Sequence, residues 1–122
     1  MLIIGPSGSG KSALALSLMA MGADLVADDQ TEVYMGDGRI MARCPATLSG
    51  LIEARGVGLL CAEPAGNAEI VLVTDLGQTE PDRLPPRRKV TILERELDLV
   101  MGCGNDHLPA AVLCYLKGKR KA

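Results

Sequence analysis

The strongest constraint on how this chain can fold lies in its first residues, where an apolar tripeptide runs into a glycine-rich loop. Leu2–Ile4 has the character of a short buried strand, and the next eight residues, GPSGSGKS, fit the G-x-x-x-x-G-K-[ST] pattern in full. Residues 12–21 are rich in Ala, Leu and Met, which predicts a helix that Gly22 ends. A strand, a tight loop and a helix in this order predict a phosphate-binding P-loop.

The residue types of this loop explain how it would hold phosphate. Glycines let backbone N–H groups turn inward around phosphate oxygens, and the start of a helix adds the positive end of its dipole. In such a loop Lys11 reaches the β- and γ-phosphates, and the Ser12 hydroxyl ligates magnesium. The predicted cofactors are ATP and Mg²⁺, and the predicted nucleotide-binding residues are Gly5, Pro6, Ser7, Gly8, Ser9, Gly10, Lys11 and Ser12.

Composition narrows the classes of protein that remain. A chain of 122 residues predicts one domain. Aromatic residues make up only 2%, so the core must be aliphatic, and a net charge of −2 gives no general attraction for nucleic acid or an anionic membrane. No apolar run is long enough to span a bilayer, and the cysteines (Cys44, Cys61, Cys103 and Cys114) form no C-x-x-C pair. We therefore expect a cytoplasmic protein with free thiols, three of them buried.

The remaining pattern predicts a mixed sheet with a second helix, because hairpins follow the first strand–helix unit instead of further strand–helix repeats. The expected elements are a strand at 24–29, a hairpin at 31–43, a short helix at 45–55, strands at 57–62 and 69–76, a loop at 77–88, a hairpin at 89–101 and a helix at 107–119. This order predicts an α/β domain.

Two adjacent carboxylates, Asp28 and Asp29, follow the apolar residues of the predicted strand at 24–29. A strand that ends in Asp beside a P-loop is a typical source of a magnesium-binding carboxylate. Two such groups side by side exceed what the metal needs, which favours one general base and one ligand to the metal or its waters. The alternative is a solvated turn after the strand.

A further charged pair, Glu53 and Arg55, lies in the segment LIEARGVGLL at 51–60. Taken alone, it is the solvated end of a helix. Taken together with the P-loop, it supplies a third carboxylate to the metal and an arginine to the phosphates.

These segments resemble the catalytic domain of the HPr kinase/phosphorylase family. The motifs that carry the resemblance are the P-loop at 5–12, Ala-Asp-Asp at 27–29 and Glu-x-Arg-Gly-x-Gly at 53–58, in this order in the first half of the chain. That family phosphorylates a serine of HPr, a small phosphocarrier of the phosphotransferase system, and can reverse the reaction with inorganic phosphate. The resemblance implies a P-loop kinase domain with a mixed sheet, akin to the nucleotide-binding domain of phosphoenolpyruvate carboxykinase.

The resemblance also implies residue roles. Asp28 would accept the proton of the attacking serine, with Lys11 as the second catalytic residue. Ser12, Asp29 and Glu53 would hold magnesium, and Arg55 would contact the nucleotide. The family is usually a hexamer, so a homo-oligomer is expected, with an HPr-like carrier as partner and neither nucleic acid nor membrane.

The chain departs from the family pattern in three places. It begins directly on the P-loop strand, and it resembles the short form, without an N-terminal regulatory domain, so residues 1–122 are expected to form a single P-loop kinase domain. An arginine of the family's C-terminal loop is missing from GCGNDHLPAAV. His107 stands there instead, as a helix-start or surface residue or as a substitute phosphate contact.

Three functions are consistent with these motifs. The first is a protein-serine kinase acting on an HPr-type carrier. The second is a small-molecule P-loop kinase, whose lid would draw on the arginines of the proline-rich loop, Arg83, Arg87 and Arg88. The third is a nucleotide-binding regulatory module without turnover. The basic C-terminal residues, Lys117, Lys119, Arg120 and Lys121, form either a solvated tail or a contact surface for an acidic partner.

Overall fold

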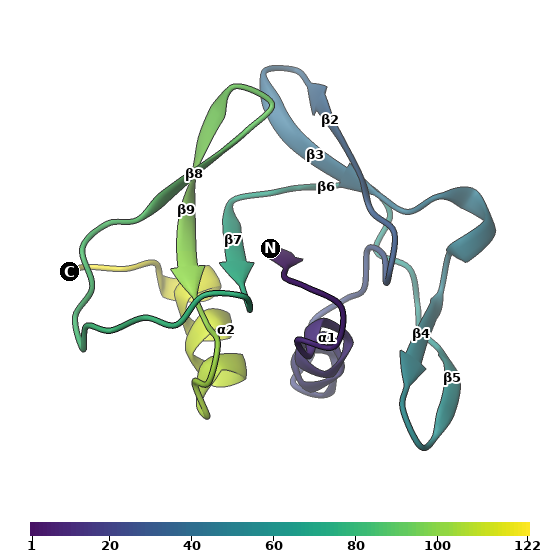
Figure 1. Ribbon diagram of the computed structural model, residues 1–122. Helices are drawn as coiled ribbons and strands as arrows, with labels where there is room; N and C mark the ends of the chain where they lie inside the picture. Colours follow the sequence, from purple (N-terminus) through teal and green to yellow (C-terminus); the bar gives the residue numbers. More distant parts are fainter. The chain divides into compact units, whose positions relative to one another are not determined.

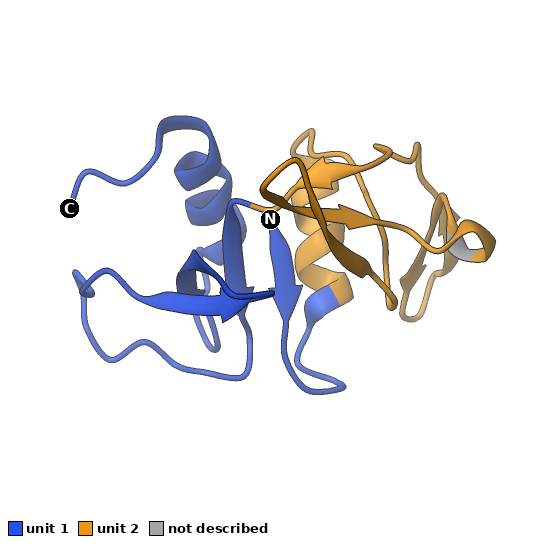
Figure 2. Cartoon of the chain, turned by 90° about the horizontal axis from the view of Figure 1, so that it is seen from above, with its two compact units in different colours: residues 1–11, 71–122 blue, residues 12–70 orange. Residues whose placement is uncertain are grey.

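The structure is a computed structural model that describes the backbone of residues 1–122 and every side chain except that of Leu48. The chain falls into two compact units, coloured separately in Figure 2. Unit 1 comprises residues 1–11 and 71–122, and unit 2 comprises residues 12–70. The expectation of a single kinase domain stays a prediction.

Unit 1 is built on a four-stranded mixed sheet in the order β1-β7-β9-β8 (Figure 1). Its strands are β1 (Leu2–Ile4), β7 (Leu72–Asp75), β8 (Lys89–Ile92) and β9 (Arg95–Met101). β7 pairs in parallel with β1 and β9, whereas β8 and β9 form an antiparallel hairpin. The predicted mixed sheet and the hairpin at 89–101 are confirmed.

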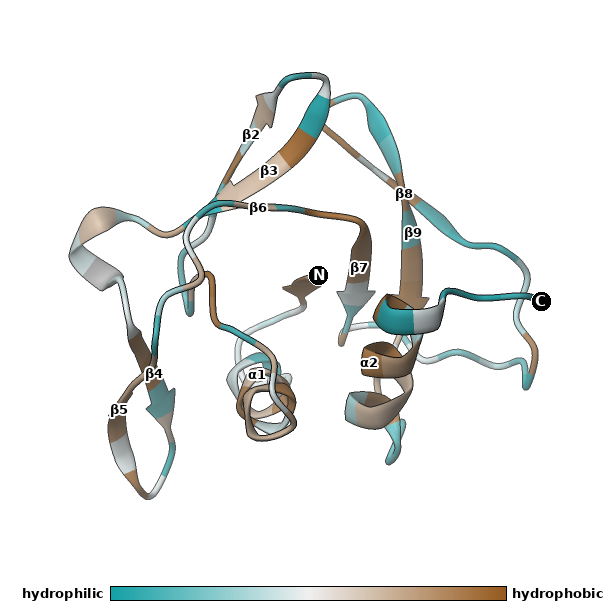
Figure 3. Ribbon diagram, turned by 180° about the vertical axis from the view of Figure 1, so that it is seen from behind, coloured by the Kyte–Doolittle hydropathy of each residue, from teal (hydrophilic) through white to brown (hydrophobic). Residues whose placement is uncertain are grey.

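Burial in unit 1 is greatest along β7 and α2 (Leu108–Gly118). Leu72, Val73 and Thr74 have no exposed surface, which is typical of a strand covered on both faces. Leu108 of α2 lies beside Gly102, where a side chain would come within 2.6 Å of a Leu108 methyl group. Hydrophobic colours follow β7 and β9 in Figure 3, and hydrophilic colours follow much of the 77–88 loop and the C-terminal tail.

Unit 2 contains most of α1 (Lys11–Ala20) and a three-stranded antiparallel sheet. The strands of this sheet are β2 (Glu32–Gly36), β3 (Arg39–Arg43) and β6 (Ala68–Glu69). Asp37 and Gly38 both have positive φ, 51° and 76°, and connect β2 to β3 as a two-residue turn. Asp-Gly is a preferred sequence for such a turn, so the hairpin predicted at 31–43 is confirmed.

The helix predicted at 45–55 is wrong over most of its length. A short 3-10 helix, η1, spans Ala46–Leu48, and the chain then turns at Gly50, whose φ is 76°. Residues 51–54 form β4 (Leu51–Ala54), which pairs with β5 (Gly58–Cys61). Glu, Ala and Arg favour a helix locally, but cross-strand pairing of apolar residues outweighs that weak preference.

Two predicted strands also differ. The segment 24–29 forms only one isolated bridge, between Leu25 and Pro64, because Pro64 has no N–H with which to continue a ladder. The strand predicted at 69–76 divides into β6 and β7 around residues 70–71.

Two composition-based predictions can be compared with the structure. All four cysteines are free, as predicted, but Cys61, Cys103 and Cys114 are exposed and Cys44 is half-buried, so the predicted burial of three cysteines is wrong. In the part of the chain that the structure describes, neither helix combines the length and apolar character needed to cross a bilayer.

Candidate functional site

The P-loop of unit 1 leaves β1 at Ile4 and closes on itself before α1 begins at Lys11. Three glycines of the loop, Gly5, Gly8 and Gly10, have φ values of 153°, 80° and 95°. Residues with a side chain rarely adopt these backbone angles, so the loop depends on glycine at these positions. The Ser9 N–H donates to the Pro6 carbonyl over 3.1 Å, which makes the turn tight.

The start of the loop has no room for a side chain at Gly5, whereas a Cβ at Gly8 or Gly10 would meet nothing within 4 Å. A Cβ at Gly5 would lie 2.6 Å from Ser9 Oγ, so Gly5 must remain glycine for steric reasons as well. Ser9 Oγ is buried and has no hydrogen-bond partner among the described residues. A small, glycine-lined loop with an unpaired hydroxyl fits the cradle that a nucleotide phosphate requires.

Lys11 lies over the first half of its own loop. Its Nζ donates to the carbonyl oxygens of Gly5 and Pro6, over 2.9 and 3.1 Å. Phosphate oxygens are charged acceptors and bind an ammonium group more strongly than neutral carbonyls do. The lysine is therefore placed where it can exchange these contacts for a bound phosphate.

In unit 2, Asp28 forms hydrogen bonds with residues of two other sequence motifs, the P-loop and Glu-x-Arg-Gly-x-Gly. Its Oδ1 accepts a hydrogen bond from the Ser12 hydroxyl over 2.8 Å, and its Oδ2 accepts one from the backbone N–H of Glu53 over 3.2 Å. Ser12 is the last residue of the P-loop pattern and follows Lys11 directly in the chain. One carboxylate thus links the end of the P-loop motif to the start of the Glu-x-Arg motif.

Asp29 lies in a different backbone conformation from Asp28. Its φ is 65°, and the Gln30 N–H donates to the Asp28 carbonyl over 2.7 Å, which closes a three-residue turn around Asp29. Positive φ is uncommon for residues other than glycine, although Asp tolerates it better than most. Asp29 is exposed, whereas Asp28 is half-buried.

The predicted metal ligands Ser12, Asp29 and Glu53 are only partly brought together. Glu53 contributes its backbone N–H to Asp28, and its side chain on β4 is exposed. Among the residues with described side chains, no three His, Cys, Asp or Glu residues gather closely enough to hold a metal ion. The magnesium assignment therefore stays a prediction, with Ser12 and Asp28 as its contacting pair of oxygen-bearing side chains.

Comparison with known proteins identifies the family. Residues 1–75, more than half of the chain, match the family described as HPr Serine kinase C-terminal domain. The chain belongs to this family. The match contains the P-loop, the Asp28–Asp29 pair and the Glu53–Arg55 segment.

Relatives of this HPr serine kinase family member are considerably longer. It is 52% identical over 60 residues to an HPr kinase/phosphorylase of Cupriavidus necator, covering 48% of this chain and 19% of the relative. It is 42% identical over 100 residues to an HPr kinase/phosphorylase of Aromatoleum aromaticum, covering 71% and 32%. The chain thus spans about a fifth to a third of the length of these curated relatives.

A solved structure shares the fold. The HPr(Ser) kinase/phosphatase from Coxiella burnetii matches with a TM-score of 0.76 over 94% of this chain and 79% of that chain. The sequence identity is 22%, so this likeness concerns the fold. The predicted α/β class with a mixed sheet agrees with it.

Two other predicted site residues of this family member lie at element ends. Arg55 is exposed in the turn between β4 and β5, which the Val57 N–H closes onto the Ala54 carbonyl over 3.0 Å. His107 directly precedes α2 and is exposed, and its N–H donates to Asn105 Oδ1 over 3.0 Å. The helix-start interpretation of His107 is therefore confirmed, and a role for Arg55 at the nucleotide stays a prediction.

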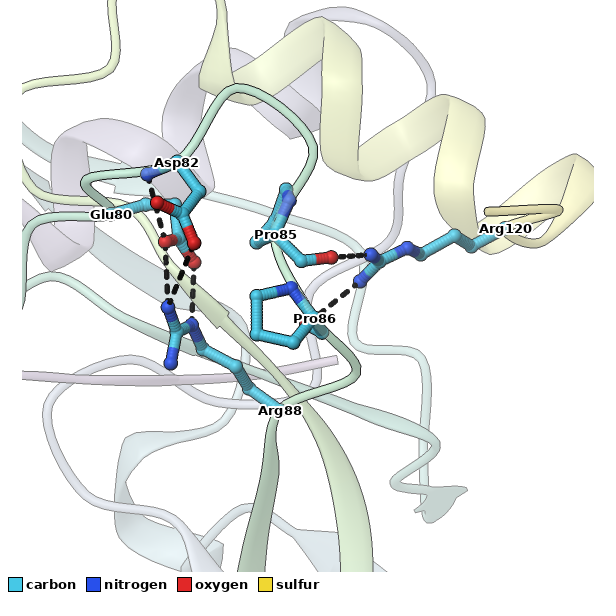
Figure 4. A network of polar contacts seen from close by, with 6 residues as sticks. All are labelled: Glu80, Asp82, Pro85, Pro86, Arg88 and Arg120. Carbon is cyan, nitrogen blue, oxygen red and sulfur yellow. Dashed lines mark hydrogen bonds and ion pairs between the residues drawn. The ribbon is translucent and has the colours of Figure 1, made fainter.

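Two of the three arginines considered for a lid, Arg87 and Arg88, form hydrogen bonds in unit 1. Arg88 donates to both carboxylate oxygens of Glu80, over 2.6 and 2.8 Å, and lies 4.0 Å from Asp82 (Figure 4). The hydrogen bond from Arg88 holds the pKa of the Glu80 carboxyl below its usual range. This pairing, together with Arg87, which binds backbone carbonyls of the C-terminal tail, disfavours the small-molecule kinase lid.

The basic C-terminal cluster is also partly held in place. Arg120 donates to the carbonyl oxygens of Pro85 and Pro86, as Figure 4 shows, and its own carbonyl accepts from Arg87. The tail and the proline-rich loop are therefore bound to each other in both directions, so this part of the tail is not simply solvated.

Sequence analysis missed one residue beside the P-loop. Asp75 ends β7, and its Cα pairs in register with Ile4, the last residue before the loop. The sequence feature that could have indicated Asp75 is the apolar run IVLV before Thr74 and Asp75. A similar run of apolar residues precedes Asp28. Asp28 was singled out because it follows the predicted P-loop helix closely in the chain, whereas β7 lies far along the chain.

Proposed function

We propose that this chain carries the phosphotransfer site of an HPr serine kinase/phosphorylase, which moves the γ-phosphoryl group of ATP to a serine of an HPr-type phosphocarrier. The observation that carries the proposal is the double contact of Asp28 with the Ser12 hydroxyl and the Glu53 N–H. Through these two hydrogen bonds, one carboxylate connects the P-loop, Ala-Asp-Asp and Glu-x-Arg-Gly-x-Gly motifs. These motifs indicate the family only in combination. The family membership and the names of the relatives support the same reaction.

The P-loop residues fit a nucleotide, and the chain provides oxygen donors for magnesium. In the proposal, residues 5–12 bind the phosphates of ATP, Lys11 neutralises the β- and γ-phosphates, and Arg55 adds a contact. Ser12, Asp29 and Glu53 hold Mg²⁺ directly or through water, as hard oxygen ligands do. When bound, Mg²⁺ neutralises the charge that develops on the transferring phosphoryl group.

Asp28 is proposed as the general base. Each of its two oxygens accepts one hydrogen bond and retains a further lone pair, so the carboxylate can take a proton while it is held in place. It would accept the proton of the attacking serine hydroxyl and return it when inorganic phosphate drives the reverse reaction. Proton transfer of this kind contributes about 10²–10⁴-fold to rate.

The acceptor in the proposal is a protein, which the names of the relatives support. A protein acceptor brings its own serine to the site. The proposal includes a cytoplasmic location, where ATP is available, and assembly as a homo-oligomer.

The proposal is tested by incubating the purified chain with an HPr-type carrier, ATP and magnesium, and by mapping the phosphorylated residue with mass spectrometry. Phosphoserine on the carrier is the expected product, and the Asp28→Asn variant is the control that should lack it. Phosphate on a sugar or nucleotide would support the small-molecule kinase instead. Tight ATP binding without transfer to any acceptor would support a regulatory module.

A further inference from the structure

The carboxyl ends of two parallel strands of unit 1 meet where the P-loop begins. Asp75 at the end of β7 pairs in register with Ile4 at the end of β1. The Leu76 N–H then donates to the Ile4 carbonyl over 2.8 Å, so the pairing continues one residue beyond the strands. In open α/β sheets, ligands bind at this edge. Residues 75–78 therefore leave the sheet at the same edge as the phosphate loop.

Residues 75–78, which we call the β7 turn, lie so close to the first half of the loop that an added Cβ on either side would be crowded. A Cβ at Gly5 would lie 3.3 Å from Leu76 Cβ and 3.4 Å from the Gly77 nitrogen. A Cβ at Gly77 would lie 3.1 Å from Pro6 Cδ. Gly5 and Pro6 thus pack against the β7 turn.

The side chain of Asp75 stabilises the β7 turn through two hydrogen bonds. Its Oδ1 accepts from the Gly77 N–H over 2.8 Å, and its Oδ2 accepts from the Gln78 side-chain amide over 2.6 Å. Backbone bonds fix the two ends of the turn, because Gly102 N–H donates to the Asp75 carbonyl and Cys103 N–H donates to the Gln78 carbonyl, over 2.9 and 3.0 Å. The carboxylate is the side-chain group that fixes the segment between these two anchors.

We propose that Asp75 is a positioning residue of the phosphate loop. The loop relies on glycines, which are free to adopt many backbone angles, so packing from outside the loop adds to the restraint that its internal hydrogen bonds provide. Groups that hold a binding shell in place contribute to affinity without touching the ligand. Asp75 supplies this restraint by keeping the β7 turn packed against Gly5 and Pro6. The inference rests on the nucleotide binding of the proposed function, and it does not depend on the identity of the phosphoryl acceptor.

The test compares Asp75→Ala with Asp75→Asn by isothermal titration calorimetry with ATP and magnesium. Alanine removes both hydrogen bonds, and we expect the Kd to rise roughly tenfold, in the range that such supporting contacts show. Asparagine can accept from the Gly77 N–H and donate to a flipped Gln78 amide, so it should restore binding to within about twofold. Equal losses in both variants would show that the negative charge acts directly, and would overturn the positioning role.

A second variant tests the same contact from the other side. Gly77→Ala would place its methyl group 3.1 Å from both Pro6 Cδ and Asp75 Oδ1, so it disturbs the packing of the β7 turn on both sides, and because Gly77 does not have positive φ, its backbone angles suit alanine. We expect weaker ATP binding with folding retained, as measured by circular dichroism. The matched control is Gly118→Ala, where a Cβ meets nothing within 4 Å and binding should be unchanged. If Asp75→Ala fails to fold, Gly77→Ala and Asp75→Asn decide the question.

The outcomes separate this inference from the proposed function. If Lys11→Ala loses ATP binding while Asp75→Ala and Gly77→Ala keep it, the loop binds nucleotide and the positioning role of Asp75 is wrong. If the unaltered chain binds no ATP, the proposed function and the inference both fail.

Discussion

The Ser12 hydroxyl donates a hydrogen bond to Asp28 Oδ1 over 2.8 Å, which connects the first turn of α1 to the segment that follows Leu25. Asp28 is half-buried and also binds the Glu53 N–H, so its carboxylate is oriented by two donors from different elements. These two hydrogen bonds restrict the rotamers of Asp28, and in the proposed function such pre-orientation of a base would lower the entropic part of the reaction barrier.

Replacing Lys11 should weaken nucleotide binding while leaving the loop backbone intact. Hydrogen bonds to charged groups contribute about 1.5–3 kcal/mol, so Lys11→Ala should raise the Kd for ATP by roughly thirtyfold. Calorimetry measures the change. Lys117→Ala, at an exposed lysine in the last turn of α2, is the control and should bind ATP normally. An unchanged Kd in Lys11→Ala would remove the P-loop from the proposed function.

The two adjacent aspartates should differ in phenotype. Asp28→Asn should lower the rate of carrier phosphorylation by about 10²–10⁴-fold and spare ATP binding, because it removes the base. Asp29→Asn should instead raise the magnesium concentration needed for half-maximal rate. Magnesium titrations of both variants give the comparison. If Asp28→Asn is the variant rescued by excess magnesium, the two roles are exchanged, which the contact of Asp28 with Ser12 would then explain.

The strand, loop and helix at the start of the chain were more predictable from sequence than the contacts around them were. The glycines of residues 5–12 mark the loop in the sequence, because Gly5, Gly8 and Gly10 adopt positive φ values that other residues rarely reach. The link between Ser12 and Asp28 depends on where the chain goes between them, and no short-range pattern encodes it. Asp75 was missed for the same reason, since its proximity to Ile4 arises from a parallel strand pairing between distant segments.

In the fold, too, some elements are determined by the local sequence and others by contacts with distant segments. Asp37-Gly38 marks its hairpin because both residues tolerate positive φ. The strand at 51–54 was mistaken for a helix because Glu53, Ala54 and Arg55 are good helix formers, and the pairing of Ile52 with Leu60 outweighs that preference. Local chemistry therefore predicts turns well, but it predicts a strand poorly when the partner strand decides the conformation.

The turn between β8 and β9 offers a stabilising substitution. Leu93 and Glu94 have φ values of 48° and 67°, which are unfavourable for both residue types, and Leu93 is 48% exposed. Replacing them with Asn and Gly should raise the free energy of unfolding by about 1 kcal/mol, because the turn then adopts its preferred sequence. Urea denaturation measures the effect.

The other hairpin supplies the control for this change. Gly38 already occupies the matching turn with φ of 76°, so Gly38→Ala should lower the free energy of unfolding by about 1 kcal/mol. Equal or opposite effects at the two turns would contradict the explanation by backbone strain.

Asp98 should make the stability of unit 1 sensitive to acid. Lys89 Nζ and the Tyr115 hydroxyl both donate to its carboxylate, and the bond from Lys89 lowers the pKa of Asp98. Because the folded pKa is depressed, the contribution is present above the unfolded value of about 3.9 and is lost as the pH falls through the folded value. Asp98→Asn should therefore be less stable than the unaltered chain at pH 7, and this difference should shrink below about pH 4.

Urea denaturation at a series of pH values measures this dependence. Asp106→Asn is the control, because Asp106 is an exposed carboxyl outside this network, and it should change stability by less than about 0.5 kcal/mol at each pH. A constant difference between Asp98→Asn and the unaltered chain at every pH would show that the carboxylate charge has no part in the stabilisation.

The parallel pairing of β1 with β7 has a consequence for synthesis on the ribosome. Leu2 pairs with Val73, so the strand that leads into the phosphate loop gains this neighbour only after all of unit 2 has been made. Residues 12–70 have all their own strand partners within that stretch and can pair while translation continues. The nascent chain thus carries the apolar strand β1 without β7 beside it until β7 emerges, and that is the interval in which a chaperone would have the most to bind.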